Sequence, residues 1–141
     1  MKKILLGIAI MTASFATSAT LYIGDSIAHG YKEYNNGKGI TKVGANPSTV
    51  FSYLEKADLD NIKNLILSTG ISNNCKQRSQ VEKQFQYIRY KNINLQILLL
   101  NSPYCKNYLF LKQLCTNDHN CRLVTFPTTD GIHPTNYKRD L

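Results

Sequence analysis

Leu95–Leu100, with the sequence LQILLL, is the stretch that decides the fold of this chain. It is apolar apart from Gln96 and shows none of the polar alternation expected of a strand with one wet face. A run of this kind predicts a strand that is buried on both faces, as in parallel sheets covered by helices on either side. The run therefore predicts a domain of the α/β class.

Amphipathic segments flank this strand in the sequence. Before it, a helix predicted over about Gln80–Asn92 places Val81, Phe85 and Ile88 on one apolar stripe. After it, a second helix is predicted from about Asn107 to Leu114. Alternation of strands and helices is the pattern that joins parallel strands through crossovers.

Four further apolar runs predict the remaining strands. They are Thr20–Ile23, Ile40–Val43, Leu65–Leu67 and Leu123–Phe126. A helix should follow the second run, because Asn46 can cap its first N–H groups and Pro47 suits its first position. Right-handed crossovers would bring the loops after the five strands to one edge of the sheet, where open α/β proteins bind ligands.

The beginning of the chain is typical of an export signal. Lys2 and Lys3 precede an apolar run from Ile4 to Met11, and the small residues Thr17–Ala19 suit signal peptidase. The alternatives are an uncleaved anchor or a buried helix, but the run is shorter than the roughly 20 residues that span a bilayer. We therefore predict a signal peptide at 1–19 and one domain at 20–141, periplasmic or secreted, with no stable membrane span after cleavage.

The charge pattern of the chain points to no particular partner. The 141 residues carry a net charge of +8, which falls to +6 when Lys2 and Lys3 leave with the signal. The basic residues are scattered rather than clustered, which is typical of a solvated surface. We predict a monomer that binds a small substrate and no nucleic acid, and no cofactor is implied.

Two short motifs at the ends of the domain carry nucleophile chemistry. Ser26 follows the first strand in Gly24-Asp25-Ser26, and Asp130-Gly131-Ile132-His133 follows the last strand. A serine hydroxyl needs a base to take its proton, and an imidazole base needs an acid to fix its tautomer. Each motif alone is more often a turn, but the two strand ends converge in space. They predict a catalytic triad of Ser26, His133 and Asp130.

Four blocks of the chain resemble the SGNH/GDSL hydrolase family. Gly24–Gly30 (GDSIAHG) resembles the first block, G-D-S-x-x-x-G, and Gly44 resembles the glycine of the second. Gly70–Asn73 (GISN) lies where the third block, G-x-N-D, belongs. Asp130–Pro134 (DGIHP) closely matches the last block, D-x-x-H-P. The blocks occur in family order and span nearly all of residues 20–141.

The resemblance implies both a fold and a reaction. The fold would be a three-layer flavodoxin-like sandwich, with a five-stranded parallel sheet of order 2-1-3-4-5 and helices on both faces. The reaction would be hydrolysis of esters or thioesters through an acyl-serine intermediate. Ser26 would attack, His133 would act as base and then acid, and Asp130 would orient His133.

The same resemblance implies an oxyanion hole made by the N–H groups of Ser26 and Gly44 and by an asparagine amide. The third block departs from the family pattern, because Ser72 takes the asparagine place when it is read without gaps. A shift of one residue gives Asn73, and Asn74 is a further alternative. We prefer Asn73, because an amide N–H always donates whereas a hydroxyl can rotate away.

The four cysteines, Cys75, Cys105, Cys115 and Cys121, suggest two disulfides in an exported protein, with three possible pairings. A zinc site is the weaker interpretation, because no C-x-x-C pair is present, and no metal site is predicted. Cys75 follows the third block and Cys105 follows the fourth strand, at one edge of neighbouring strands. This favours Cys75–Cys105, which leaves Cys115–Cys121.

Other polar residues receive structural interpretations. Asp25 is expected to bind its own turn, His29 to form local structure, and Asn117–His119 to be a polar loop. Only a very short closing helix, capped by Thr135, is expected after His133, and this would leave the pocket partly open.

Three functions follow from this reading. The first is an exported esterase that acts on a small acyl ester or an acylated glycan, for example by deacetylating an envelope glycan. The second is a lysophospholipase or thioesterase, which long-chain activity without acetyl-ester activity would favour. The third is a catalytically degenerate member that serves as a binding protein.

Overall fold

The sheet of this protein is five-stranded, parallel throughout and ordered β2-β1-β3-β4-β5. The computed structural model describes residues 19–70, 78–102 and 108–138. The strands are β1 (Thr20–Gly24), β2 (Gly39–Thr41), β3 (Asn64–Ser68), β4 (Gln96–Asn101) and β5 (Cys121–Thr125). The predicted α/β class and strand order are confirmed.

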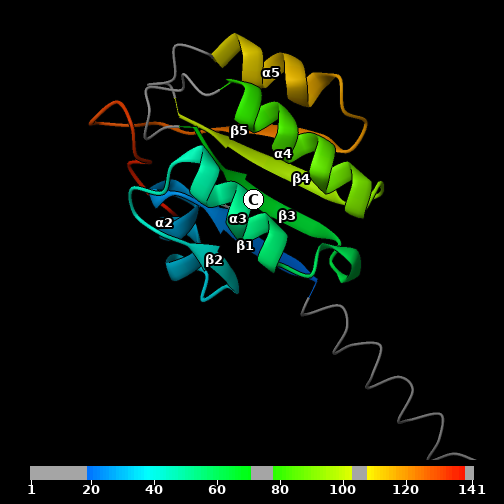
Figure 1. Ribbon diagram of the computed structural model, residues 1–141. Coiled ribbons are helices and arrows are strands. Elements are labelled where there is room, and N and C mark those ends of the chain that lie inside the picture. Colours follow the sequence, from blue (N-terminus) through cyan, green and yellow to red (C-terminus); the bar gives the residue numbers. More distant parts are fainter. Residues whose placement is uncertain (1–18, 71–77, 103–107, 139–141) are drawn as a thin grey trace, which may run out of the picture.

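Helices cover both faces of the sheet, in three layers (Figure 1). They are α2 (Ser26–Tyr34), α3 (Pro47–Lys56), α4 (Arg78–Lys91) and α5 (Tyr108–Thr116), with a 3-10 turn η1 (Leu59–Asn61). Helices α3, α4 and α5 pack on one face, and α2 packs on the other. No helix among the described residues is long and apolar enough to cross a membrane.

Strand β4 contributes to the hydrophobic core on both of its faces. Ile97 and Leu99 pack with α3, α4 and α5, while Leu98 and Leu100 pack with α2. All four side chains are buried. The apolar run from which the fold was predicted is therefore a strand with no wet face, as expected for a parallel sheet covered on both sides.

The start of α3 follows its capping residues as predicted. Asn46 is the N-cap, and its Oδ1 accepts a 2.9 Å hydrogen bond from the Thr49 N–H. Pro47 is the first helical residue, where its missing N–H costs nothing. Strand β2 is shorter than predicted and ends at Thr41, because a turn follows in which the Ala45 N–H donates to the Lys42 carbonyl.

The expected closing helix after His133 is wrong for the described residues. Residues 134–138 are not helical, and the Thr135 N–H donates to the Pro127 carbonyl. Thr128 and Pro134 form an antiparallel bridge beside this bond. The chain therefore returns along itself after β5, and residues 128–134 form a closed loop.

The predicted disulfide between Cys115 and Cys121 is confirmed. It closes the turn between α5 and β5. Cys75 and Cys105 lie outside the described residues, as does the predicted signal peptide apart from Ala19.

A half-buried ion pair holds this same turn against α4. Arg89 Nε and Nη2 donate to the two carboxylate oxygens of Asp118 at 2.6 and 2.7 Å, and Nη1 donates to the Leu95 carbonyl at 2.6 Å. The Arg89 and Asp118 side chains are only 16% and 13% exposed. Partial burial acts to raise the pKa of Asp118, but hydrogen bonds from Arg89 and from the Asn120 N–H outweigh it and lower this pKa.

Replacing Arg89 with leucine should lower the free energy of unfolding by about 2–4 kcal/mol, because the half-buried Asp118 carboxylate loses its charged partner and keeps the Asn120 N–H, while the Leu95 carbonyl loses the guanidinium. The matched control is Arg78→Leu, which removes an exposed pair with Glu82 and a contact with the Phe110 ring and should cost only about 1 kcal/mol. Urea unfolding of both variants measures the difference. Equal losses would contradict a structural role for the Arg89 pair.

Candidate active site

Ser26 is placed by the end of β1 and the start of α2. Gly24, the last residue of β1, has φ +144°, and a Cβ there would overlap the Ser68 carbonyl oxygen. Only glycine fits this position. The Asp25 N–H then donates to that same carbonyl, and α2 begins at Ser26. The close approach of β1 to β3 thus sets where the serine enters its helix.

Asp25 caps the helix that Ser26 begins. Its Oδ1 accepts hydrogen bonds from the Ile27 N–H at 3.1 Å and from the Ser68 hydroxyl at 2.6 Å. The Asp25 side chain is buried. This confirms the structural interpretation of Asp25, and it adds Ser68, to which the sequence analysis gave no role.

Ser26 and His133 meet at the carboxyl edge of the sheet although 107 positions separate them. Ser26 Oγ lies 2.9 Å from His133 Nε2, and His133 Nδ1 lies 2.9 Å from Asp130 Oδ2. Because an ionised carboxylate only accepts hydrogen bonds, Nδ1 carries the ring proton, and Nε2 accepts from the serine hydroxyl. The three predicted triad residues are therefore joined by one continuous line of hydrogen bonds.

Asp130 is held in its ionised form by donors from its own loop. The His133 side chain contributes most to keeping the pKa of the Asp130 carboxyl well below its usual value, and the N–H groups of His133 and Ile132 add to this effect. Those two N–H groups donate to Oδ1 at 2.7 and 2.8 Å, and the Thr128 hydroxyl donates at 3.0 Å. Oδ2 is thus left to orient the imidazole.

The loop that carries the imidazole is fastened to the sheet by Ser102. This residue directly follows β4 and is fully buried, and its hydroxyl donates a 2.8 Å hydrogen bond to the Ile132 carbonyl. Ser102 was not among the residues predicted from the sequence. The available signal was its place directly after a buried strand, at the edge where the other site residues were expected.

Two of the three predicted oxyanion donors lie in the described part of the chain. The Ser26 N–H is in the first turn of α2, where helix N–H groups have no partner within the helix. Gly44 has φ +82° in the exposed turn after β2. Neither N–H donates to another described residue. Asn73 lies outside the described residues, as do Ser72 and Asn74.

The remaining polar candidates have structural partners. His29 Nδ1 lies 2.9 Å from the Thr41 hydroxyl, which links α2 to β2. Asn117–His119 lies before β5, at the opposite edge of the sheet from Ser26, and Asp118 is paired with Arg89. Both interpretations from the sequence agree with these contacts.

The described residues hold no group of three or more His, Cys, Asp or Glu that could bind a metal ion. No protein-family model matches the chain, and no curated protein matches it. The chemistry of the site therefore has to be argued from its own geometry.

Replacing Asp25 with alanine should lower the free energy of unfolding by about 2–3 kcal/mol, since it removes a buried helix cap and leaves the Ser68 hydroxyl without its acceptor. Asn46→Ala is the matched control, because Asn46 caps α3 from an exposed position and should cost only about 1 kcal/mol. Chemical denaturation compares the two. A larger loss for Asn46→Ala would show that Asp25 does not secure the start of α2.

Proposed function

We propose that this chain is an exported serine hydrolase that cleaves carboxylic esters through an acyl-serine intermediate. The observation that carries this proposal is the hydrogen-bonded line from Ser26 Oγ through the His133 imidazole to Asp130, with 2.9 Å at each step. A serine with a neutral imidazole at this distance, itself oriented by a carboxylate, is the arrangement that activates a hydroxyl for nucleophilic attack.

The reaction follows from the direction of these hydrogen bonds. Ser26 Oγ attacks the ester carbonyl carbon while His133 Nε2 takes the hydroxyl proton. The tetrahedral intermediate collapses, and the alcohol leaves with that proton, so that an ester of Ser26 remains. Water then attacks this ester, with His133 again acting first as base and then as acid. The products are the alcohol, the carboxylic acid and the free serine.

Two charges develop during each step, a positive one on His133 and a negative one on the substrate oxygen. The imidazolium that forms on His133 faces the Asp130 carboxylate, which stays ionised because of the donors in its loop. The oxyanion would be held by the Ser26 N–H at the positive end of α2 and by the Gly44 N–H. Removing one such donor from a hydrolase typically costs about 3–4 kcal/mol of transition-state stabilisation.

The exposure of the triad supports a substrate that is approached at the protein surface. The side chains of His133 and Asp130 are 40% and 53% exposed. In the described part of the chain, the base and its carboxylate partner thus both face solvent. We therefore propose a small acyl group carried by a larger molecule, such as an acetyl ester on an envelope glycan.

An oxidising compartment is supported by the turn between α5 and β5. The Cys115–Cys121 disulfide closes it across a sequence separation of only six. Disulfides of this kind persist outside the reducing cytosol. Together with the signal-like residues 1–19, this favours a protein that works in the periplasm or after secretion.

A fluorophosphonate probe should label the oxidised protein covalently at Ser26, because the activated hydroxyl attacks phosphorus as it attacks an ester carbonyl. Ser26→Ala should abolish the label, whereas Ser52→Ala should retain it. Ser52 is a matched control, because its hydroxyl only donates to the Thr49 carbonyl within α3. Intact-mass spectrometry measures the adduct. No adduct on the folded wild type would refute the enzyme and favour the binding-protein alternative.

Hydrolysis of p-nitrophenyl acetate should decline as the pH is lowered into the acidic range, with kcat/KM falling about tenfold per pH unit, because a protonated imidazole cannot act as base. Asp130 should add no second decline down to about pH 4, since its pKa is held below the ordinary carboxyl range. The pH dependence of kcat/KM measures this. A flat profile into the acidic range would argue against His133 as the base.

A further inference from the structure

The loop that carries Asp130 and His133 is clamped at both of its ends by one aromatic ring. That ring is Tyr31, which is fully buried on α2. Phe126, at the entry to the loop, packs against Tyr31 with ring centroids 6.4 Å apart, and Tyr137, at the exit, packs with centroids 5.0 Å apart. Both contacts are edge-to-face, the geometry that aromatic pairs favour.

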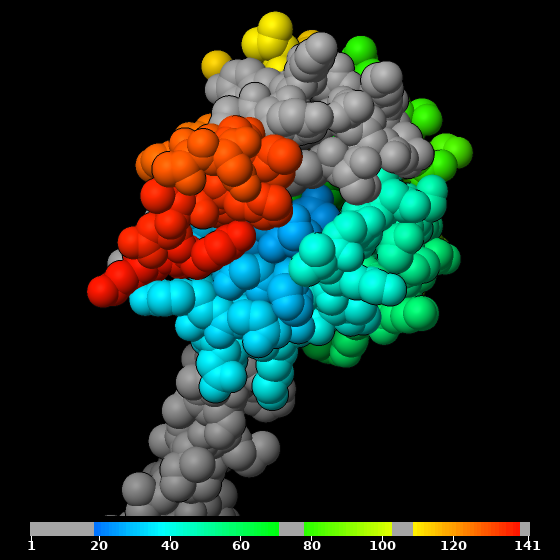
Figure 2. Space-filling view, turned by 90° about the vertical axis from the view of Figure 1, so that its left-hand side faces the viewer, coloured from blue at the N-terminus to red at the C-terminus, as the bar shows by residue number. Residues whose placement is uncertain are grey.

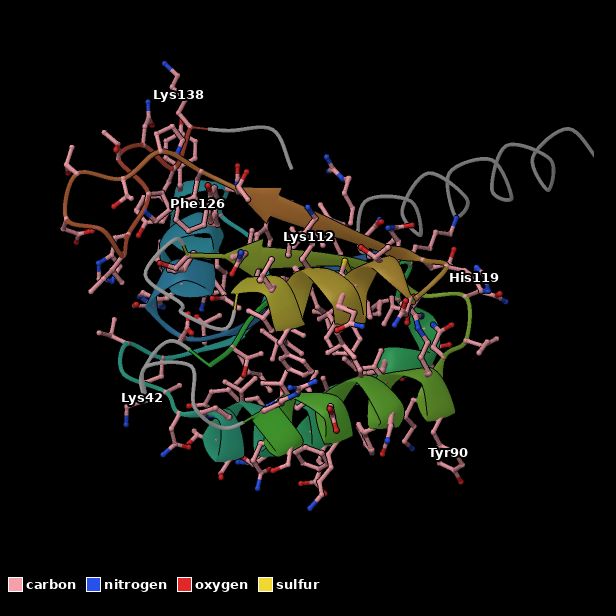
Figure 3. All side chains as sticks on the ribbon, turned by 90° about the horizontal axis from the view of Figure 1, so that it is seen from above. Lys42, Tyr90, Lys112, His119, Phe126 and Lys138 are labelled. Carbon is pink, nitrogen blue, oxygen red and sulfur yellow. A yellow bond between two sulfur atoms is a disulfide. The ribbon has the colours of Figure 1, made fainter. Side chains whose placement is uncertain are left out.

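The same helix carries the serine. Ser26 is the first residue of α2 and Tyr31 lies one and a half turns further on. Figure 3 shows the segment from Phe126 to Lys138 running beside α2, and Figure 2 shows the red C-terminal residues against the blue and cyan N-terminal part. The three rings of Tyr31, Phe126 and Tyr137, here called the aromatic clasp, thus join the two halves of the triad outside the triad itself.

Gly30 makes room for the clasp. A Cβ at this position would overlap Cε1 and Cζ of the Tyr137 ring. Gly30 lies inside α2, where alanine would ordinarily stabilise the helix. The glycine is therefore explained by the ring that covers it and not by the helix. A side chain there would push Tyr137 off α2 and away from Tyr31.

Few other contacts hold the exit of the loop. Pro134 is buried and bridges Thr128, and beyond it Thr135, Asn136 and Lys138 are exposed. Tyr137 is the residue of this tail that packs against the α2 core. Burial, followed by the neighbouring Tyr31 and Asp130, raises the pKa of Tyr137, so the phenol remains neutral and contributes through its ring.

We propose that Tyr137, seated on Gly30 and Tyr31, is a positioning residue that sets His133 at hydrogen-bonding distance from Ser26. Without the ring, the described contacts near the exit of the loop are the Pro134 bridge and the Thr135 hydrogen bond, with Ser102 holding Ile132 before His133, and the imidazole moves relative to the hydroxyl. This inference rests on the proposed function, since it assigns how the triad of that function is kept in register. A displacement of about 1 Å in such a site can cost on the order of 100-fold in rate.

The test compares Tyr137→Ala, Tyr137→Phe and Gly30→Ala with the wild type in the oxidised protein. The matched control is Tyr90→Ala, which removes a tyrosine that is 84% exposed on α4. The rate of Ser26 labelling and the kcat and KM for p-nitrophenyl acetate are measured well below each variant's thermal midpoint. Tyr137→Ala and Gly30→Ala should lower kcat about 10- to 100-fold with little change in KM. Tyr137→Phe and Tyr90→Ala should stay within about threefold of the wild type.

A double substitution distinguishes an effect of Tyr137 that acts through His133 from a nonspecific effect on the fold. If Tyr137 acts through His133, Tyr137→Ala should have no further effect on the residual hydrolysis of His133→Ala. An equal loss in both backgrounds would overturn the inference, and so would a fully active Tyr137→Ala variant.

A second readout does not depend on catalysis. The imidazole C–H resonances of His133, assigned with His133→Ala, should shift in Tyr137→Ala, while those of the exposed His119 stay in place. Unchanged His133 resonances would overturn the inference even if Ser26 is labelled. If the wild type is never labelled but the His133 resonances still shift in Tyr137→Ala, the proposed function is overturned and the positioning role of Tyr137 stands.

Discussion

The contact between Ser26 and His133 depends on one constraint, which is that a fully parallel sheet brings the ends of all its strands to one edge. Ser26 comes two residues after the end of the first strand in the chain, and His133 comes shortly after the last. In the sheet, β3 and β4 lie between β1 and β5, because the strand order is β2-β1-β3-β4-β5. The carboxyl ends of β3 and β4 therefore lie between the strand that precedes the serine and the strand that precedes the histidine.

Two buried serines show how the sheet passes its geometry on to the site. Ser68, at the end of β3, donates to Asp25, which caps the helix of the nucleophile. Ser102, just after β4, donates to the carbonyl of Ile132, next to the base. Both serines are fully buried, so their hydroxyls form hydrogen bonds with the protein in place of hydrogen bonds with water. The central strands thus place the serine and the histidine separately.

The loop after β5 is organised around the Asp130 carboxylate and the rings on α2. Asp130 collects the N–H groups of its own turn with one oxygen and orients His133 with the other. The aromatic clasp then holds the two ends of this loop against α2. This loop has little regular structure. The hydrogen bonds to Asp130 and the ring contacts with Tyr31 together give it a defined shape.

Much of the fold could be predicted from the sequence, because its signals are local. The apolar run Leu95–Leu100 requires a strand with two covered faces, and Asn46-Pro47 specifies where α3 begins. The Cys115–Cys121 bridge was also predictable, although its pairing had to be chosen among three. The identity of the three candidate triad residues came from two short motifs at the ends of strands.

Tertiary structure decided what these residues touch. The path of the chain after His133 was predicted as a short helix, yet residues 134–138 fold back without one, since the Thr135 N–H pairs with Pro127 and Tyr137 packs on α2. The residues near Gly30 in the sequence do not predict its contact with the Tyr137 ring, 107 positions away. The residues near Ser102 likewise do not predict its hydrogen bond to the Ile132 carbonyl. Local patterns specify periodicity and caps, whereas contacts between distant segments depend on how the layers pack, and that is a property of the whole fold.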